Sequence, residues 1–531
     1  MTLHLTIQEY LAARFLSERR DSFARIRPRL HDPRWTEVVK LTASTLRGDY
    51  AATFVEQILD AHAPHEEIEK RLPSLTRASS VTRQSSGQQT IGLADRPTGE
   101  PKLDLRRREL IRTLLAFLDV TLGADCLVEG VTVAPAVRRW TVRFVIDRWL
   151  DDTVTRHRWR RTLTRLGREV ATDDVDMALR RVLADATSDA ALKADAVETL
   201  AEINPRPETA RVLLDVLTTA GESDWVRAGA ARGLAGILRT DEDLRRMLLA
   251  ILMDRTRESK TRRYAAVALG ETGRLADNDI RVFLEILLDK HNNAEVRWGA
   301  AEALGELDRV RPDVEDALVR VVRNPAEDPR LRFTSAIAAG RMPGIRTSSL
   351  SVLLKLLQDP TEDAFVRWGA LLALGWDEPR IEGLGPTLFS IVRNPGEDPF
   401  LRGEAAPLLA ATALDHDEAG EALVALARDK AAAAKVRMGA IRGLGKIGAR
   451  HPPGLRTLVE VMRDATEEAW LRTSALFACA ERWRDHRSII PLLLEGIDDP
   501  EIHDNVLSAL FKILSEGGPQ AIEQVTGPID G

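Results

Sequence analysis

One repeat of 35 residues constrains the fold of this chain more than any other feature of its sequence. Four copies read WVRAGAARGLAG, EVRWGAAEALGE, FVRWGALLALGW and KVRMGAIRGLGK. The arginine that these copies share recurs every 35 residues, at Arg227, Arg262, Arg297, Arg332, Arg367, Arg402, Arg437 and Arg472. Lys193 and His503 hold the same place in degenerate terminal copies, so about ten units are predicted between residues 173 and 515. A repeat this short cannot bury its apolar face alone, and stacked copies form a solenoid.

Each unit is predicted to contain two helices, which makes the fold class all-α. The first helix carries an i, i+1, i+3, i+4 apolar stripe, as in Leu248, Leu249, Ile251 and Leu252. In several units this helix is expected to stop at a residue that precedes proline, at Asn324–Pro325, Asp359–Pro360 and Asn394–Pro395. In the second helix small residues and leucine follow the arginine, which lets neighbouring helices approach closely.

The alternation of LLxLL helices with VRxxAAxALG helices resembles the HEAT-repeat family, in its short variant known as PBS-lyase HEAT-like repeats. The signatures of tetratricopeptide and ankyrin repeats are absent. The resemblance implies an armadillo-like α-solenoid that binds a protein or another macromolecule and carries no catalytic site.

The recurrent arginine has two interpretations. It is either a ladder of anion ligands or a structural group that pairs with acids just before its own helix or with the adjacent unit. Acidic pairs four and five residues earlier, such as Glu327–Asp328 and Glu362–Asp363, favour the structural interpretation.

Aromatic residues follow the arginine directly in three consecutive units, at Trp298, Phe333 and Trp368. They either wedge between units or form an apolar strip on the inner surface, where solenoids bind partners. Trp376 lies farther from the buried stripe and is a fourth candidate for partner contact.

The rest of the chain divides by composition into a helical segment over residues 1–75, a linker over 76–103 rich in Ser, Gln, Thr and Gly, and a basic helical adaptor over 104–172. The solenoid then occupies 173–531. Residues 106–168 carry 14 basic and 7 acidic side chains, whereas 169–531 carry 46 and 60. The acidic solenoid is therefore a poor match for a nucleic-acid backbone.

A basic cluster surrounds Trp159 in the adaptor and comprises Arg156, Arg158, Arg160, Arg161 and Arg165. It is either a nucleic-acid patch or a solvated basic face that docks on acidic repeats or another domain. A nucleic-acid-binding protein that uses residues 106–168 is therefore the alternative function.

The first residues read LHLTIQEYLAARFL and predict a helix that begins at about Ile7, with Thr6 as its N-cap and Glu9 completing a capping box. Together with DPRWTEVVKLTASTL at 32–46, this stretch resembles the junction between the winged-helix and helical parts of NACHT-type (STAND) NTPases. The resemblance implies a bacterial signalling or defence system in which the repeats sense a ligand. It also implies that His4 contacts bound nucleotide.

The chain lacks the phosphate-binding motif GxxxxGK[ST] of those NTPases, so a P-loop module is expected to be separate or missing. No HExxH, GxSxG or paired Cys–His motif predicts another catalytic site, and neither a metal site nor a cofactor is expected. An enzyme such as a bilin lyase or a base-excision enzyme is the third hypothesis. Cys126 and Cys479 are far apart in sequence, and neither a signal peptide nor a membrane span is evident, so a cytoplasmic location is expected.

Overall fold

The computed structural model describes residues 2–61, 101–482 and parts of 493–513, apart from short gaps at 20, 31–34, 47–48, 152–155, 239–240, 274, 310, 376–380, 413–415 and 449–450. Every regular element within these ranges is a helix, which confirms the all-α prediction. The chain divides into two compact units, of which the first holds residues 1–171 with 452–531 and the second holds 172–451.

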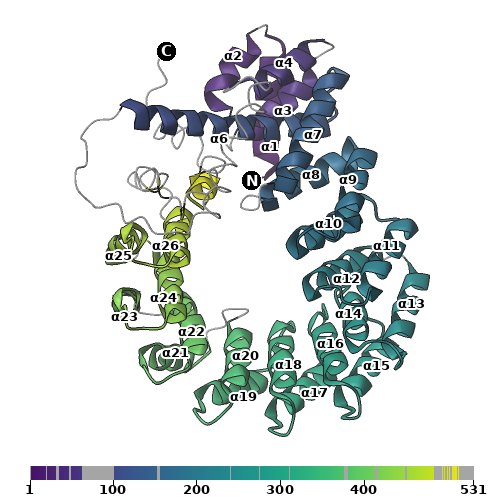
Figure 1. Ribbon diagram of the computed structural model, residues 1–531, viewed down its shortest axis with the longest axis vertical. Coiled ribbons are helices and arrows are strands. Elements are labelled where there is room, and N and C mark those ends of the chain that lie inside the picture. The colour runs from purple at the N-terminus through teal and green to yellow at the C-terminus, as the bar shows by residue number, and fades with distance from the viewer. Residues whose placement is uncertain are drawn as a thin grey trace. The chain divides into compact units, whose positions relative to one another are not determined.

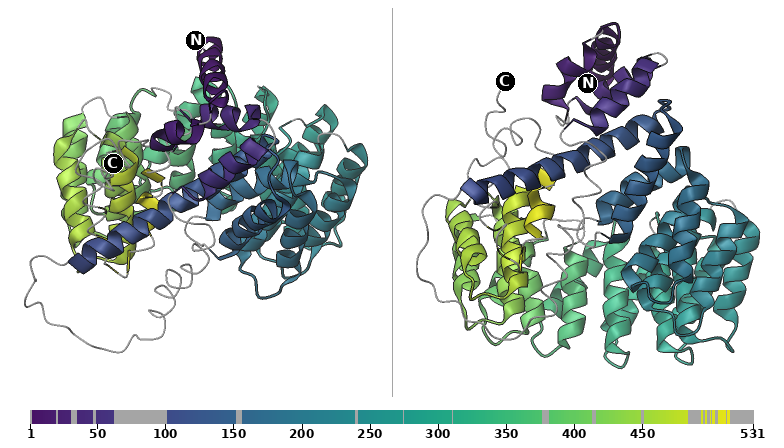
Figure 2. Two further views of the ribbon diagram at one scale, coloured as in Figure 1. Left: turned by 90° about the horizontal axis from the view of Figure 1, so that it is seen from above. Right: turned by 45° about the horizontal axis from the view of Figure 1, so that its top comes forward.

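The first unit contains the N-terminal helices, the basic segment and one repeat. The longest of its described helices is α6, with 28 residues (Figure 2). Helix α1 packs on α3, α4 packs on α6, and α7 packs on α8. The elements are α1 (Thr2–Ser17), α2 (Ser22–Ile26), a 3-10 helix (Arg27–Arg29), α3 (Thr36–Thr45), α4 (Asp49–Leu59), α6 (Pro101–Val128), α7 (Pro135–Asp151), α8 (Arg156–Glu169), α25 (Pro452–Arg463) and α26 (Ala469–Arg482).

Helix α1 differs from its predicted form. It begins at Thr2 rather than at Ile7, so Thr6 lies inside the helix and cannot act as its N-cap. None of the residues from Thr2 to Leu5 breaks a helix, and the helix therefore extends through the predicted capping box. The predicted linker at 76–103 lies almost entirely outside the described residues.

The second unit is a curved stack of helix pairs in which even-numbered helices form the inner layer and odd-numbered helices the outer layer (Figure 1). Consecutive even-numbered helices contact each other along the whole stack. The helices are α9 (Thr172–Ala184), α10 (Ala190–Ile203), α11 (Pro207–Thr218), α12 (Asp224–Leu238), α13 (Glu242–Met253), α14 (Ser259–Gly270), α15 (Asp277–Leu288), α16 (Ala294–Gly305), α17 (Pro312–Arg323), α18 (Pro329–Arg341), α19 (Thr347–Gln358), α20 (Ala364–Leu374), α21 (Leu384–Arg393), α22 (Pro399–Thr412), α23 (His416–Arg428) and α24 (Ala434–Ile447).

The helix ends predicted before the Asn-Pro and Asp-Pro pairs are confirmed. Helices α17, α19 and α21 end at the residue immediately before Asn324, Asp359 and Asn394. In each case the residue before proline leaves the helical conformation and is extended. The short turn that follows leads into the next even-numbered helix.

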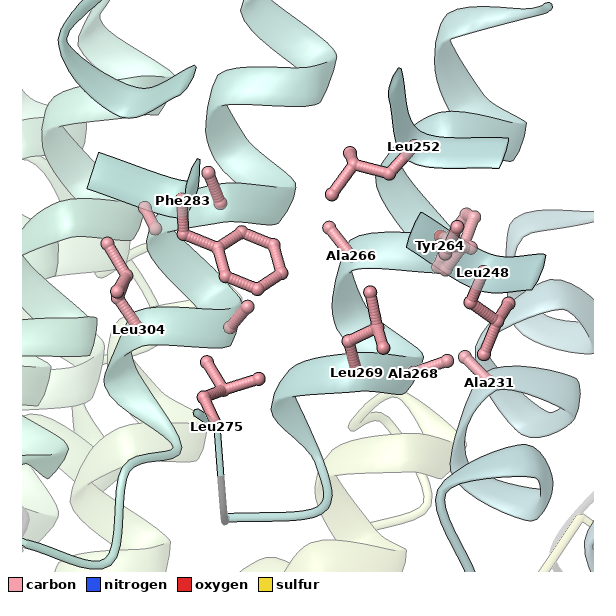
Figure 3. Packing of buried hydrophobic residues seen from close by; sticks show 14 of the residues in the cluster. Ala231, Leu248, Leu252, Tyr264, Ala266, Ala268, Leu269, Leu275, Phe283 and Leu304 are labelled. Carbon is pink, nitrogen blue, oxygen red and sulfur yellow. The ribbon is translucent and has the colours of Figure 1, made fainter. Parts of the chain in front are cut away.

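The core of this unit lies between the two layers. Leu248 and Leu252 of α13 and Phe283 of α15 are fully buried. In Figure 3, Leu248 lies near Ala231 of α12 and Tyr264 of α14, so one outer helix contributes to contacts with two inner ones. Each repeat thus buries its apolar stripe only in the presence of its neighbours.

A glycine that recurs in every second repeat adds a longer period to the 35-residue repeat. Glycine occupies the second position after the arginine in alternate repeats, at Gly229, Gly299, Gly369 and Gly439. A Cβ atom at Gly299 would lie 2.8 Å from the backbone oxygen of Arg263, and one at Gly439 would lie 1.9 Å from that of Gly403. These glycines bring α16 against α14 and α24 against α22, so the inner helices associate closely in pairs.

No helix of the described residues is both long and apolar enough to span a membrane.

Candidate functional site

Seven of the eight recurrent arginines are buried, Arg402 is half-buried, and several of the eight link adjacent repeats. The Nε of Arg332 donates a hydrogen bond to the backbone oxygen of Val322 at 2.8 Å, and its two terminal nitrogens donate to Glu362 of the next repeat at 2.9 and 2.6 Å. Arg367 and Glu397 repeat this arrangement at 2.8 and 2.9 Å. The arginine therefore pairs with the adjacent unit rather than with the acids just before its own helix.

The two acids that precede α18, Glu327 and Asp328, have different roles. Glu327 accepts a hydrogen bond from Arg297 of the preceding repeat at 2.7 Å. Asp328 caps its own helix, because its carboxylate accepts from the amides of Arg330 and Leu331 at 3.0 and 3.1 Å. The hydrogen bond from Arg297 lowers the pKa of Glu327 despite partial burial, so this carboxylate is ionised at neutral pH.

Among the described residues, Arg262 and Arg402 form no ion pair with an acid of the next repeat. The residue thirty positions after Arg262 is Asn292, and the one after Arg402 is Ala432. Burial lowers the pKa of both arginines, because nearby carboxylates compensate less for their lost hydration. We call the recurrent arginines and their glutamate partners the arginine ladder. In the described part of the chain this ladder has a structural role, and its arginines are poorly placed to bind an external anion.

Trp298 lies within the stack and is only 8% exposed. The guanidinium of Arg263 from the preceding repeat lies 5.7 Å from its ring, and that of Arg330 from the following repeat lies 4.8 Å away. These distances are typical of cation–π contacts. Of the two interpretations of this residue, the structure favours a wedge between repeats.

Phe333 and Trp368 form a half-buried aromatic cluster with Phe365 on α18 and α20. The Phe333 and Phe365 rings stack with centroids 4.2 Å apart, and Trp368 lies 5.0 Å from Phe333. Phe365 was not predicted, although it lies three residues before Trp368 and therefore on the same helical face. The aromatic cluster, defined as Phe333, Phe365 and Trp368, is an apolar feature of the inner layer.

A cavity of about 290 Å³ adjoins the aromatic cluster. Phe333 contributes to both, since its ring also lines the cavity. The remaining walls come from α12, α14, α16 and α18 and combine apolar with charged side chains, among them Val267, Ile337, Arg232, Arg263, Glu271, Glu302, Glu306 and Arg341.

Ion pairs occupy most of the charged groups in this cavity. Arg263 pairs with Glu302 at 2.7 Å, and Arg341 pairs with Glu306. Among the described residues, no cation lies within ion-pair distance of Glu271. Partial desolvation of the carboxylate, together with the charge of Glu306, raises the pKa of Glu271, although the nearby Arg232 and Arg341 act in the opposite direction.

The basic cluster of the adaptor is only partly available to solvent. Arg156 is buried, Arg158 and Arg160 are half-buried, and Arg161 is exposed. Arg165 pairs with Asp125 and lies 3.9 Å from Glu129.

Trp159, at the centre of the basic cluster, is a core residue rather than a surface aromatic. Its ring makes edge contacts with Phe117 and Phe144 at 5.8 and 6.0 Å. Base stacking at the basic cluster therefore cannot use this ring.

Two predicted contact residues cannot be placed. Trp376 and the side chain of His4 lie outside the described residues.

The described residues contain no cluster of His, Cys, Asp or Glu that could hold a metal ion. Cys126 and Cys479 are buried free thiols, and burial raises the pKa of each to about 12. Neither thiol is therefore a reactive nucleophile at neutral pH.

Comparison with known proteins agrees with this architecture. A family model of HEAT repeats matches residues 280–375. No curated protein matches the sequence.

Several solved structures resemble this one at low sequence identity. Kap121p is 13% identical, with a TM-score of 0.37, over 87% of this chain and 53% of that one. An engineered protein is 18% identical, with a TM-score of 0.24, over 77% of this chain and 98% of that one. The UNC-45 chaperone is 12% identical, with a TM-score of 0.27, over 92% of this chain and 65% of that one.

The chain spans about half the length of Kap121p. Because the identities and TM-scores are low, these similarities carry no conclusion about what the chain binds. The protein is an α-solenoid whose residues 280–375 match a family model of HEAT repeats.

Proposed function

We propose that this protein is a non-catalytic scaffold that binds a partner protein on the inner layer of its second unit. The aromatic cluster of Phe333, Phe365 and Trp368 carries this proposal. Aromatic residues on a rigid support are typical centres of protein interfaces, and inner solenoid surfaces are their usual location. The arginine ladder beneath them holds α18 and α20 in register, which preorganises the surface.

A photo-crosslinker at Thr334 tests this proposal directly. Thr334 lines the cavity beside Phe333 and is half-buried. In the cells that normally produce the protein, p-benzoylphenylalanine at 334 is expected to yield a discrete protein adduct on illumination. Glu285 on outer helix α15 is exposed and serves as the matched control position. The adduct is measured by gel shift and mass spectrometry.

The same experiment can reject the proposal. Adding Trp368→Ala is expected to reduce the adduct at 334 by about tenfold, the effect of losing an interface aromatic. An equal yield at 285, or an adduct that is insensitive to Trp368→Ala, would place the partner elsewhere.

We propose nucleic-acid binding through residues 106–168 as a second candidate function, supported by their excess of basic side chains. The reversal of Arg158, Arg160 and Arg161 to Glu is expected to abolish binding to labelled duplex DNA or RNA at low salt. Binding by the unaltered protein is expected to weaken steeply between 50 and 200 mM salt, since cations would be released from the phosphates. Fluorescence anisotropy measures both effects. Absent or salt-insensitive binding eliminates this candidate.

The finer hypothesis, that the protein is the ligand-sensing part of a bacterial NACHT-like signalling or defence system, rests on the resemblance of residues 4–13 and 35–38. It predicts that the full chain co-purifies with a P-loop NTPase from a neighbouring gene and that His4→Ala weakens retention of ADP by the complex. If no NTPase associates with the chain, this hypothesis fails and the scaffold proposal is unaffected.

A further inference from the structure

The aromatic cluster and the charged cavity form one continuous surface on the inner layer. Phe333 stacks on Phe365 and also lines the cavity, and Ile337, one helical turn later on α18, extends the apolar wall. An apolar side chain that contacts Phe333 therefore places its neighbouring residues at the mouth of the cavity. This continuity restricts which ligand can use both parts.

The cavity has few free groups with which to bind an anion. The guanidinium of Arg263 holds Glu302 and lies 5.2 and 5.7 Å from the rings of Tyr264 and Trp298. Arg341 pairs with Glu306, and Arg232, the third arginine of the cavity wall, pairs with Glu198. An acidic side chain that entered the cavity would have to displace one of these carboxylates and would also meet Glu271.

Glu271 is well placed to receive a cation. Its side chain borders the 290 Å³ cavity and also an adjoining cavity of about 360 Å³, and it is exposed to solvent. Glu306 and its ion-pair partner Arg341 line both cavities as well, so among the described residues Glu271 is the carboxylate of their shared edge that forms no ion pair. A lysine or arginine side chain could extend its methylene groups along Val267 and Ile337 while its charged end reaches Glu271.

From this juxtaposition we infer that the inner layer over α14–α20 binds a segment of a partner protein in which a lysine or arginine lies next to a large apolar side chain. The apolar side chain packs on the aromatic cluster, and the cation pairs with Glu271. This inference rests on the proposed scaffold function and specifies the chemistry of its partner.

Phage-displayed random peptides selected on the immobilised full chain provide the probe. The enriched sequences are expected to combine Lys or Arg with an adjacent Phe, Trp, Leu or Ile. One such peptide is then synthesised with a fluorophore, and its dissociation constant is measured by anisotropy. Glu271→Gln is expected to weaken binding about three- to tenfold and Phe333→Ala at least tenfold.

Matched variants separate binding from folding. Glu285→Gln makes the same chemical change on outer helix α15 and is expected to alter the dissociation constant less than about twofold. Thr334→Arg places a cation at the half-buried rim of the cavity and is expected to repel the basic peptide by like charge. Circular dichroism of each variant verifies that the helical content is unchanged.

The outcomes distinguish this inference from the function on which it rests. Enrichment of acidic or uncharged peptides whose binding still requires Phe333 would overturn the inferred chemistry and leave the scaffold function in place. Enriched peptides that bind Phe333→Ala and Thr334→Arg as tightly as the unaltered chain would overturn both, and so would a selection that enriches no peptide.

Discussion

Gly439→Ala is expected to destabilise the α22–α24 pair by at least about 3 kcal/mol, near the upper end of the usual cost of overpacking. The Cβ atom would lie 1.9 Å from the backbone oxygen and 2.6 Å from the backbone carbon of Gly403. Both are main-chain atoms, so no side-chain rotation can relieve the contact. The helices must separate, and the packing on both sides of the pair must change with them.

Hydrogen exchange is the appropriate measurement, because a repeat array need not unfold in a single two-state transition. Amides of α22 and α24 are expected to lose protection in Gly439→Ala, whereas those of α12 keep it.

Gly236→Ala is the matched control for this substitution. Gly236 is exposed on α12, and no atom lies within 4 Å of the position its Cβ would take. Its replacement is expected to stabilise α12 by about 0.5–1 kcal/mol through helix propensity. Unchanged protection of α22 and α24 in Gly439→Ala would contradict the close helix contact.

Arg332→Met is expected to destabilise the stack around α18 by about 3 kcal/mol or more, the usual cost of breaking a buried ion pair. The substitution removes the hydrogen bond to the carbonyl oxygen of Val322 and leaves the mostly buried carboxylate of Glu362 without its partner. Arg323→Met, at an exposed arginine on α17, is expected to change stability by less than about 0.5 kcal/mol. Urea unfolding of both variants, monitored by circular dichroism, measures the difference. Similar unfolding midpoints for the two variants would show that the arginine ladder contributes little to stability.

Acid should weaken the ion pair between Arg332 and Glu362, as the pKa of Glu362 indicates. The hydrogen bond from Arg332 lowers the pKa of Glu362 below the usual range of a glutamate. The contribution of the pair is therefore complete well above the ordinary glutamate pKa of about 4.3 and is lost as the pH falls through the lower, folded-state pKa. Stability of the unaltered chain should fall over this range, and that of Arg332→Met should fall less. Equal acid dependence in the two proteins would contradict the pairing.

The sequence predicted the repeats because their signal is periodic and local. A constant spacing of the arginine and an i, i+3, i+4 apolar stripe require two helices per unit whatever the neighbours do. The helix ends before Asn324, Asp359 and Asn394 were predictable for the same reason, since proline restricts the residue that precedes it. The start of α1 was predicted wrongly, because a capping-box sequence is also compatible with a helix that begins earlier.

The candidate site was predicted only in part. Trp298, Phe333 and Trp368 occupy equivalent positions in the repeat, yet Trp298 is held between two guanidinium groups and the other two join Phe365 in a half-buried cluster. The difference arises from Arg263 and Arg330, which belong to the neighbouring repeats. Periodicity places a side chain on a face but does not specify what the next repeat places against it.

By itself the sequence determined that this chain is an all-α solenoid of stacked two-helix repeats, with an arginine at a fixed place in eight of them. Only the tertiary structure decided which carboxylate each arginine meets, which aromatic residues reach the surface, and that Glu271 faces a cavity shared by four inner helices. The physical reason is that helix formation and apolar periodicity depend on residues a few positions apart. Ion pairs, cavities and exposure depend on residues about 30 or more positions apart that stacking brings into contact.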